Sequence, residues 1–230
     1  MDSQRFARLV GQMAGPVPAR LDTQGVGTLS EKPLHAALKA YYLPPDGQAE
    51  ARLGRYIVDI LSPAGAVEIQ TRGLYPLRKK LPALLAACPV TVVYPLAHRK
   101  RIHWVDPASG ALSGGRLSPK TGSGADALRQ LFWLREWIGL PGLTIRLPLV
   151  DLEEYRLQSG WGSGGKRGSV RLCQIPTALF DELIVRSPQD LLSLLPAGLP
   201  SPFTRQALQK AARLSPRAAG DGLRLLCGLG

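Results

Sequence analysis

Hydrophobic residues recur along the chain with the two periods that are typical of helices and strands. Residues 29–43 carry apolar side chains three and four positions apart and end at a Pro-Pro pair, which predicts a helix. Residues 55–61 and 66–71 are rich in β-branched side chains and flank Ser-Pro-Ala-Gly, so we expect two strands joined by a tight turn. The pattern then predicts a helix over residues 75–88, with a break near Pro82.

The second half of the chain continues to mix the two periods, and no internal repeat is visible. An uninterrupted apolar run over residues 89–96 predicts a strand at the centre of a sheet. The remaining expectations are strands over 101–107, 110–117, 143–157 and 170–175, a helix over 124–139 and a short helix over 187–195.

Turn-forming residues suggest how the chain is divided. We expect an N-terminal arm over residues 1–28, an α/β domain over 29–195, a Pro/Gly-rich linker over 196–202 and a helical segment over 203–230. The fold class predicted by this order is α/β, with a mixed sheet, flanking helices and a small C-terminal helical segment.

Charge points to an anionic partner. The net charge is +12, and 45% of the residues are hydrophobic, which is enough for a packed core. Nine basic residues but one acid lie between Arg72 and Lys120, so this segment contributes +8. The three cysteines lack the spacing of a zinc site. Because no apolar run is long enough for a signal peptide or a membrane span, we expect a cytoplasmic protein without membrane contact.

The predicted hairpin carries acids on otherwise apolar strands, and two registers are open for it. If all four turn residues form the loop, Asp59 faces Glu68, and these acids share one face with Gln70. If Gly65 forms a left-handed bulge, Asp59 faces Ile69 and both faces become mixed. The pattern favours the first register, which sets two carboxylates side by side, an arrangement that a divalent cation would relieve. The alternative is a solvated hairpin face.

This order of elements, with Asp59 and then Glu68-x-Gln70, resembles the restriction-endonuclease-like PD-(D/E)XK nuclease superfamily over residues 29–105. The resemblance implies an α-β-β-β-α-β core, with Asp59 and Glu68 as ligands of Mg²⁺ or Mn²⁺. Gln70 stands where the superfamily usually has lysine, although some restriction enzymes are active with Glu-x-Gln. Glu31 matches an extra acid that some members carry.

Because Gln70 replaces the usual lysine, a lysine from another element could take over its role. Lys79 or Lys80 on the following helix would supply a migrated positive charge; otherwise both face solvent. The chain also looks like a family of uncharacterised bacterial proteins with LHAALK, VTVVYP, EEYRL and IPTAL stretches. That second likeness implies no activity.

Residues 203–230 resemble a helix-turn-helix of the winged-helix kind, without the wing. Helix caps at Thr204 and Ser215 predict two short helices. The candidate nucleic-acid contacts along the whole chain are Arg72, Lys79, Lys80, Lys166, Arg167, Arg205 and Arg217.

Two functions follow as hypotheses. The first is a DNA-binding, metal-dependent nuclease in which Asp59, Glu68, Gln70 and Glu31 form the active site. The second is a DNA-binding or regulatory protein that keeps the fold and has lost cleavage. Nucleic acid, expected to be DNA, is the partner in both, and a homodimer is left open.

Overall fold

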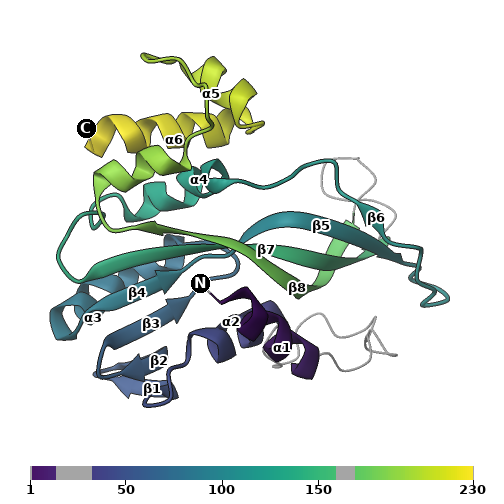
Figure 1. The fold of residues 1–230 in the computed structure, drawn as a ribbon, viewed down its shortest axis with the longest axis horizontal. Helices are drawn as coiled ribbons and strands as arrows, with labels where there is room; N and C mark the ends of the chain where they lie inside the picture. The colour runs from purple at the N-terminus through teal and green to yellow at the C-terminus, as the bar shows by residue number, and fades with distance from the viewer. Residues whose placement is uncertain (1, 14–32, 159–168, 230) are drawn as a thin grey trace. The chain divides into compact units, whose positions relative to one another are not determined.

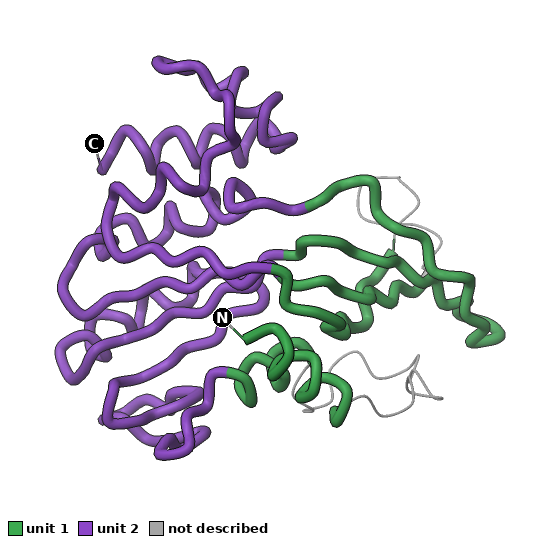
Figure 2. The backbone as a smooth tube through the Cα atoms, viewed as in Figure 1, with its two compact units in different colours: residues 1–41, 97–121, 150–180 green, residues 42–96, 122–149, 181–230 purple. Residues whose placement is uncertain are grey.

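The computed structural model describes residues 2–13, 33–158 and 169–229. The fold is α/β, with a mixed β-sheet and flanking helices (Figure 1). The chain forms two compact units that each draw on three separate segments (Figure 2). Unit 1 comprises residues 1–41, 97–121 and 150–180, and unit 2 comprises residues 42–96, 122–149 and 181–230.

Unit 2 contains the predicted hairpin. Its strands follow the order β1-β2-β3-β4-β7, in which β1, β2 and β3 are antiparallel neighbours, whereas β3–β4 and β4–β7 are parallel pairs. The central strand β4 is apolar and buried, as its unbroken run of β-branched residues predicts. The bounds are β1 Gln48–Leu53, β2 Tyr56–Ser62, β3 Gly65–Ile69, β4 Val90–Val93 and β7 Leu143–Gln158, of which residues 143–149 belong to this unit.

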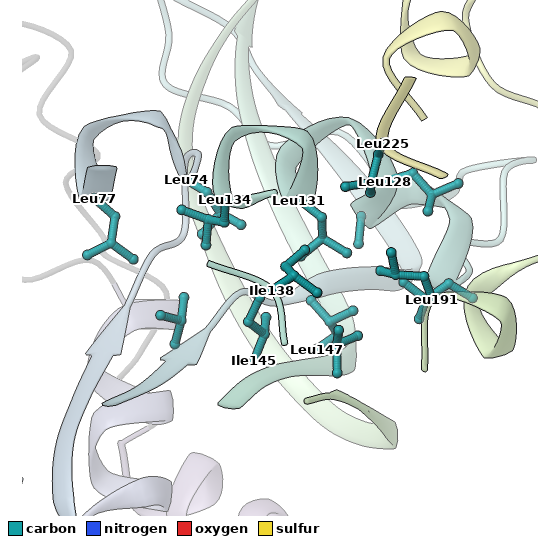
Figure 3. Packing of buried hydrophobic residues seen from close by; sticks show 14 of the residues in the cluster. Leu74, Leu77, Leu128, Leu131, Leu134, Ile138, Ile145, Leu147, Leu191 and Leu225 are labelled. Atoms are coloured by element: carbon teal, nitrogen blue, oxygen red, sulfur yellow. The ribbon is translucent and has the colours of Figure 1, made fainter. Parts of the chain in front are cut away.

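Short helices complete unit 2 and enclose its core. Leucines from several of these helices converge with Ile145 and Leu147 of β7, as Figure 3 shows. Helix α6 packs against α4 and α5, so the C-terminal residues 203–229 lie within this unit. The bounds are η1 Tyr75–Lys79, α3 Leu81–Ala87, η2 Gly124–Ala127, α4 Leu128–Leu131, η3 Phe132–Leu134, η4 Pro188–Leu194, α5 Arg205–Ala211 and α6 Pro216–Leu229.

Unit 1 combines strands with the N-terminal helices. Helix α1 (Ser3–Met13) buries Phe6 edge-on against Tyr41 at the end of α2 (Pro33–Tyr42). Its strands are β5 (Leu96–Val105, from residue 97), β6 (Arg116–Leu117) and residues 150–158 of β7, together with residues 169–180 of β8 (Ser169–Val185). None of the helices in the described ranges is both long and apolar enough to cross a membrane.

Several elements differ from the sequence expectation. The break near Pro82 is confirmed, because η1 ends at Lys79 and α3 begins at Leu81. The single helix expected over residues 124–139 is wrong, since this segment is divided among η2, α4 and η3. A 3₁₀ turn places every third residue on one side. Four of the buried residues follow this spacing: Ala125, Leu128, Leu131 and Leu134.

Two strands were incompletely predicted. Strand β8 continues to Val185, ten residues beyond the expected end of its strand. Strand β1 was not predicted at all, because its inward positions include Ala51, and alanine is a weak strand former. The hairpin that carries the acids is therefore flanked on one side by β1 and on the other by β4.

Candidate active site

The hairpin adopts the first of the two registers. Leu61 pairs with Ala66 and Ile60 pairs with Val67, so Asp59 and Glu68 are the next opposed positions. Opposed residues in antiparallel strands share a face, which places both carboxyl groups on the same side of the sheet. The Asp59 carboxylate also accepts a hydrogen bond from the backbone N–H of Ile69, at 2.7 Å from Oδ2.

Gly65 fixes this register through its backbone. Its φ of 121° lies in the region that favours glycine, and a Cβ at this position would lie 2.2 Å from the carbonyl oxygen of Pro89. That carbonyl accepts a hydrogen bond from the N–H of Ala66 at 2.9 Å. The hairpin is thus held directly against the start of β4.

Glu68 is the most buried acid of the hairpin. Only 1% of its surface is exposed, and Nζ of Lys80 lies 2.6 Å from its Oε2. Its second oxygen, Oε1, is buried without a hydrogen-bond partner among the described residues. A buried acceptor that lacks a donor costs folding free energy, and a cation or a hydrogen-bond donor at Oε1 would remove that cost.

Lys80 is the lysine that completes the cluster. It lies at the junction where η1 ends and α3 begins, and 24% of its side chain is exposed. Of the two lysines that could replace the one missing at Gln70, Lys80 is the one that lies beside Glu68. The neighbouring Lys79 is exposed instead.

Burial raises the pKa of the Glu68 carboxyl above its ordinary value, and the negative charge of Asp59 raises it further. Lys80 opposes this shift without cancelling it. Gln70 is close enough to favour the ionised form slightly, although it makes no hydrogen bond of normal geometry to Oε1. The site therefore resists a second negative charge unless a further cation enters.

A divalent ion fits this donor set in part. Asp59 and Glu68 supply hard carboxylate oxygens, and the unpartnered Oε1 offers a free ligand position. Within the described ranges, however, no three His, Cys, Asp or Glu side chains come together in a way that could hold a metal ion. Mg²⁺ commonly binds to one or two carboxylates and fills its other positions with water and phosphate oxygens, so two protein ligands suffice.

Sequence reasoning missed one acid beside the pair. Ala49 pairs with Ile60 and Ala51 pairs with Val58, so Glu50 of β1 occupies the register position opposite Asp59. Its φ of 52° lies in the left-handed region, which is rare for a residue other than glycine. The signal was hidden because β1 itself was not predicted.

The other predicted residues divide into three groups. Arg72 and Lys79 lie on the exposed surface of unit 2, next to the hairpin and to Lys80 in sequence. Arg205 and Arg217 are exposed on α5 and α6. Glu31, Lys166 and Arg167 lie outside the described residues.

Unit 1 holds a separate set of acids, each with a basic partner. Asp151 receives His98 Nδ1 at 2.8 Å, and Glu153 lies 3.7 Å from Nε2 of His103. Burial favours the protonated form of Glu154, but its basic partners outweigh burial and lower the pKa of this carboxyl. Those basic partners are Arg156 at 2.5 Å and Lys100 at 3.8 Å, and the neutral amide of Gln174 donates a further hydrogen bond at 2.8 Å.

Comparison with known proteins places the chain in a family. Residues 32–186 match the family described as "Domain of unknown function (DUF8091)", which is more than half of the chain. The chain belongs to the DUF8091 family. Asp59, Glu68, Gln70 and Lys80 all lie inside the DUF8091 match, whereas α5 and α6 lie after it.

One relative of this DUF8091 chain comes from Treponema pallidum (strain Nichols) and is described as an uncharacterized protein. It is 33% identical over 138 residues, which cover 60% of this chain and 55% of the relative. The chain thus spans about half the length of the relative that it matches. No solved structure matches the chain significantly.

Proposed function

We propose that the chain is a restriction-endonuclease-like nuclease, with its site residues in unit 2, that hydrolyses phosphodiester bonds in DNA with Mg²⁺ or Mn²⁺. The observation that carries this proposal is buried Glu68, which shares a face with Asp59, pairs one oxygen with Lys80 and leaves the other without a partner. A carboxylate is rarely buried so deeply without satisfying both oxygens unless the site is functional.

The order of elements supports the same proposal. Helix α2 is followed by β1, β2 and β3, then by α3 and β4, which is the α-β-β-β-α-β order of the superfamily that Asp59 and Glu68-x-Gln70 resemble. Strand β1, which the sequence did not reveal, supplies the third strand of that order. The acids lie on the second and third strands, where the resemblance places them.

Each residue of the cluster has a role in this proposal. Asp59 and Glu68 would hold the ion, which when bound would polarise the scissile phosphate and lower the pKa of a water. Lys80 would donate a hydrogen bond to that water or to a phosphate oxygen, in place of the lysine that Gln70 replaces. Gln70 would orient the water, and exposed Arg72 and Lys79 would bind flanking phosphates.

One observation favours the second candidate, a DNA-binding protein without cleavage. Lys80 forms an ion pair with Glu68 at 2.6 Å, so the fold can persist with this pair and no ion. In both candidates the partner is DNA, and the expectations of a cytoplasmic location and of a homodimer stay predictions.

Plasmid cleavage tests the proposal directly. The purified chain is incubated with supercoiled plasmid and Mg²⁺ or Mn²⁺, beside Asp59→Asn and Lys80→Met. We expect metal-dependent nicking by the wild type and a loss of about 100-fold or more in each variant, because each removes a group that acts on the reacting phosphate.

Lys210→Met is the matched control for this assay. It removes an equal charge from an exposed lysine of α5 to which the proposal gives no role, so its nicking rate should stay within a few-fold of the wild type. Nicking that survives Asp59→Asn would refute the assigned site. DNA binding with no nicking in either metal would leave the non-catalytic candidate.

A further inference from the structure

Aromatic and basic side chains form a continuous surface on η1, η3 and the residues next to them. The ring of Tyr75 meets that of Trp133 edge-on, with centroids 4.8 Å apart, and Trp133 in turn meets Phe132 at 5.7 Å. The guanidinium of Arg135 lies 4.5 Å from the centre of the Phe132 ring. We call Tyr75, Phe132 and Trp133, with Arg78 and Arg135, the aromatic platform.

Charge pairs extend the aromatic platform to a second arginine–ring contact. Arg135 and Arg78 both reach Oε1 of Glu136, at 3.4 and 3.3 Å. Arg78 also lies over the ring of Trp137, 5.8 Å from its centre. The platform is thus a single run of contacts that includes two arginines and one acid.

The core holds this platform from below. Leu74 and Leu77 flank Tyr75 in sequence, and Leu131 and Leu134 flank Phe132 and Trp133; these leucines are buried and point into the cluster shown in Figure 3. Tyr75 itself is 55% exposed. A single exposed ring is common on protein surfaces, but contiguous aromatic side chains on a rigid support favour a binding surface.

The charge around the platform favours a polyanion. Arg72 and Lys79 are exposed on either side of Tyr75 in sequence, and they join Arg78 and Arg135 against the single acid Glu136. A ring beside several cations matches the chemistry of a nucleic-acid strand, whose bases stack while its phosphates pair with the cations.

We infer that the aromatic platform binds unpaired bases of a single-stranded nucleic acid and leads that strand to Lys80 and Glu68. This inference rests on the proposed function, because it names the substrate form that the proposed site would receive. Tyr75 begins the 3₁₀ helix that Lys80 terminates, so their Cα atoms are about 10 Å apart at the usual rise of such a helix.

A base in an intact duplex has no free face, which is why the platform distinguishes single strands from duplexes. Aromatic side chains stack on bases that are already unpaired, whereas a duplex offers these rings only its backbone and grooves. The arginines and Lys79 bind phosphates in either form and therefore add affinity without selecting the form.

Fluorescence anisotropy tests the inference without cleavage. A fluorescein-labelled oligo-dT strand and a duplex of equal length are titrated with the full chain in EDTA. We expect tighter binding of the single strand, and Tyr75→Ala should weaken that binding by about ten-fold, since one stacked base is lost. Tyr75→Phe keeps the ring and should bind within two-fold of the wild type.

A matched control removes an exposed apolar side chain elsewhere in unit 2. Leu192 is 64% exposed, and Leu192→Ala should leave both titrations unchanged. Single-strand binding by Tyr75→Ala equal to that of the wild type would overturn the inference, as would equal binding of strand and duplex by the wild type.

The outcome is separable from that of the proposed function. Loss of single-strand binding in Tyr75→Ala, in a chain that cleaves neither plasmid nor a single-stranded oligonucleotide with Mg²⁺ or Mn²⁺, would support the platform and remove the nuclease. Metal-dependent nicking that requires Asp59, together with unchanged binding by Tyr75→Ala, would support the nuclease and remove the platform.

Discussion

At the scale of single residues, the site is defined by an imbalance at Glu68. Lys80 compensates one oxygen of a carboxylate that the core hides from water, and Asp59 adds a second negative charge nearby. The pKa of Glu68 lies above its ordinary value because burial, the largest cause, and the charge of Asp59 outweigh Lys80. A divalent ion would restore the balance, and this gives a test that does not require catalysis.

Glu68→Gln should change how stability depends on pH. Because the pKa of Glu68 is raised in the folded state, the folded chain binds a proton more tightly than the unfolded chain does. This contribution to stability is fully present below about 4.3, the ordinary pKa of a glutamate, and is lost as the pH rises through the higher folded pKa. Glu68→Gln should remove that loss. Thermal unfolding of both proteins from pH 4 to 8 measures the difference.

Mg²⁺ or Mn²⁺ should raise the unfolding temperature of the wild type, and more so at higher pH, because ligands must be deprotonated. Glu68→Gln should lose this response, whereas Glu136→Gln, which changes an exposed acid, should keep it. A response that is equal in all three proteins would show that the ion binds elsewhere.

At the scale of elements, the hairpin is the decisive unit, and its turn fixes where the acids lie. Gly65 allows the chain to reverse while it lies against the backbone of Pro89. Gly54, in the turn between β1 and β2, also has a positive φ, of 60°, but a Cβ there would meet nothing within 4 Å. A comparison of substitutions at the two glycines therefore separates the effect of backbone conformation on stability from the effect of close packing.

Gly65→Ala should destabilise the protein by about 2–4 kcal/mol, since it combines an unfavourable φ with a backbone clash. Gly54→Ala should cost only about 1 kcal/mol, because conformation alone is affected. Urea unfolding of both variants measures these free energies. Equal losses would mean that contact with Pro89 does not constrain the hairpin.

The hairpin also shows how far the sequence could lead. Its register followed from the alternation of apolar and polar side chains, which leaves one arrangement with two uniform faces. The alternation could not reveal β1, whose alanines carry little strand preference, or the 3₁₀ spacing of Leu128, Leu131 and Leu134. Nor could it choose between Lys79 and Lys80, which are adjacent in sequence but differ in exposure at the junction between η1 and α3.

At the scale of the whole molecule, 29 basic residues exceed 17 acidic residues, and several of the acids form ion pairs within their own unit. In unit 2, Glu182 pairs with Arg146 at 2.8 Å, and Asp221 pairs with Arg224 at 3.0 Å. In unit 1, Glu154 is buried with Arg156. Internal pairing of the acids leaves the remaining cations to set the field at the surface.

Glu154→Gln should have the opposite pH signature to Glu68→Gln. The pKa of Glu154 is lowered in the folded state, so its contribution exists above about 4.3 and is lost as pH falls through the lower folded value. We expect a loss of about 1–2 kcal/mol at pH 7, allowing for its partly exposed partners, and almost none at pH 2–3. Denaturant unfolding at both pH values measures it; a loss that does not vary with pH would exclude an ionic origin.

The location of Lys80 at a helix junction has one more consequence. The amine and the carboxylate that it contacts are borne on separate segments, twelve residues apart, rather than on one strand. Mutations can therefore accumulate around the acid without disturbing the amine, and a chain organised in this way escapes any signature that demands Glu-x-Lys in a row. Homologues of this arrangement should be sought by their three-dimensional constellation of acid, amide and ammonium groups.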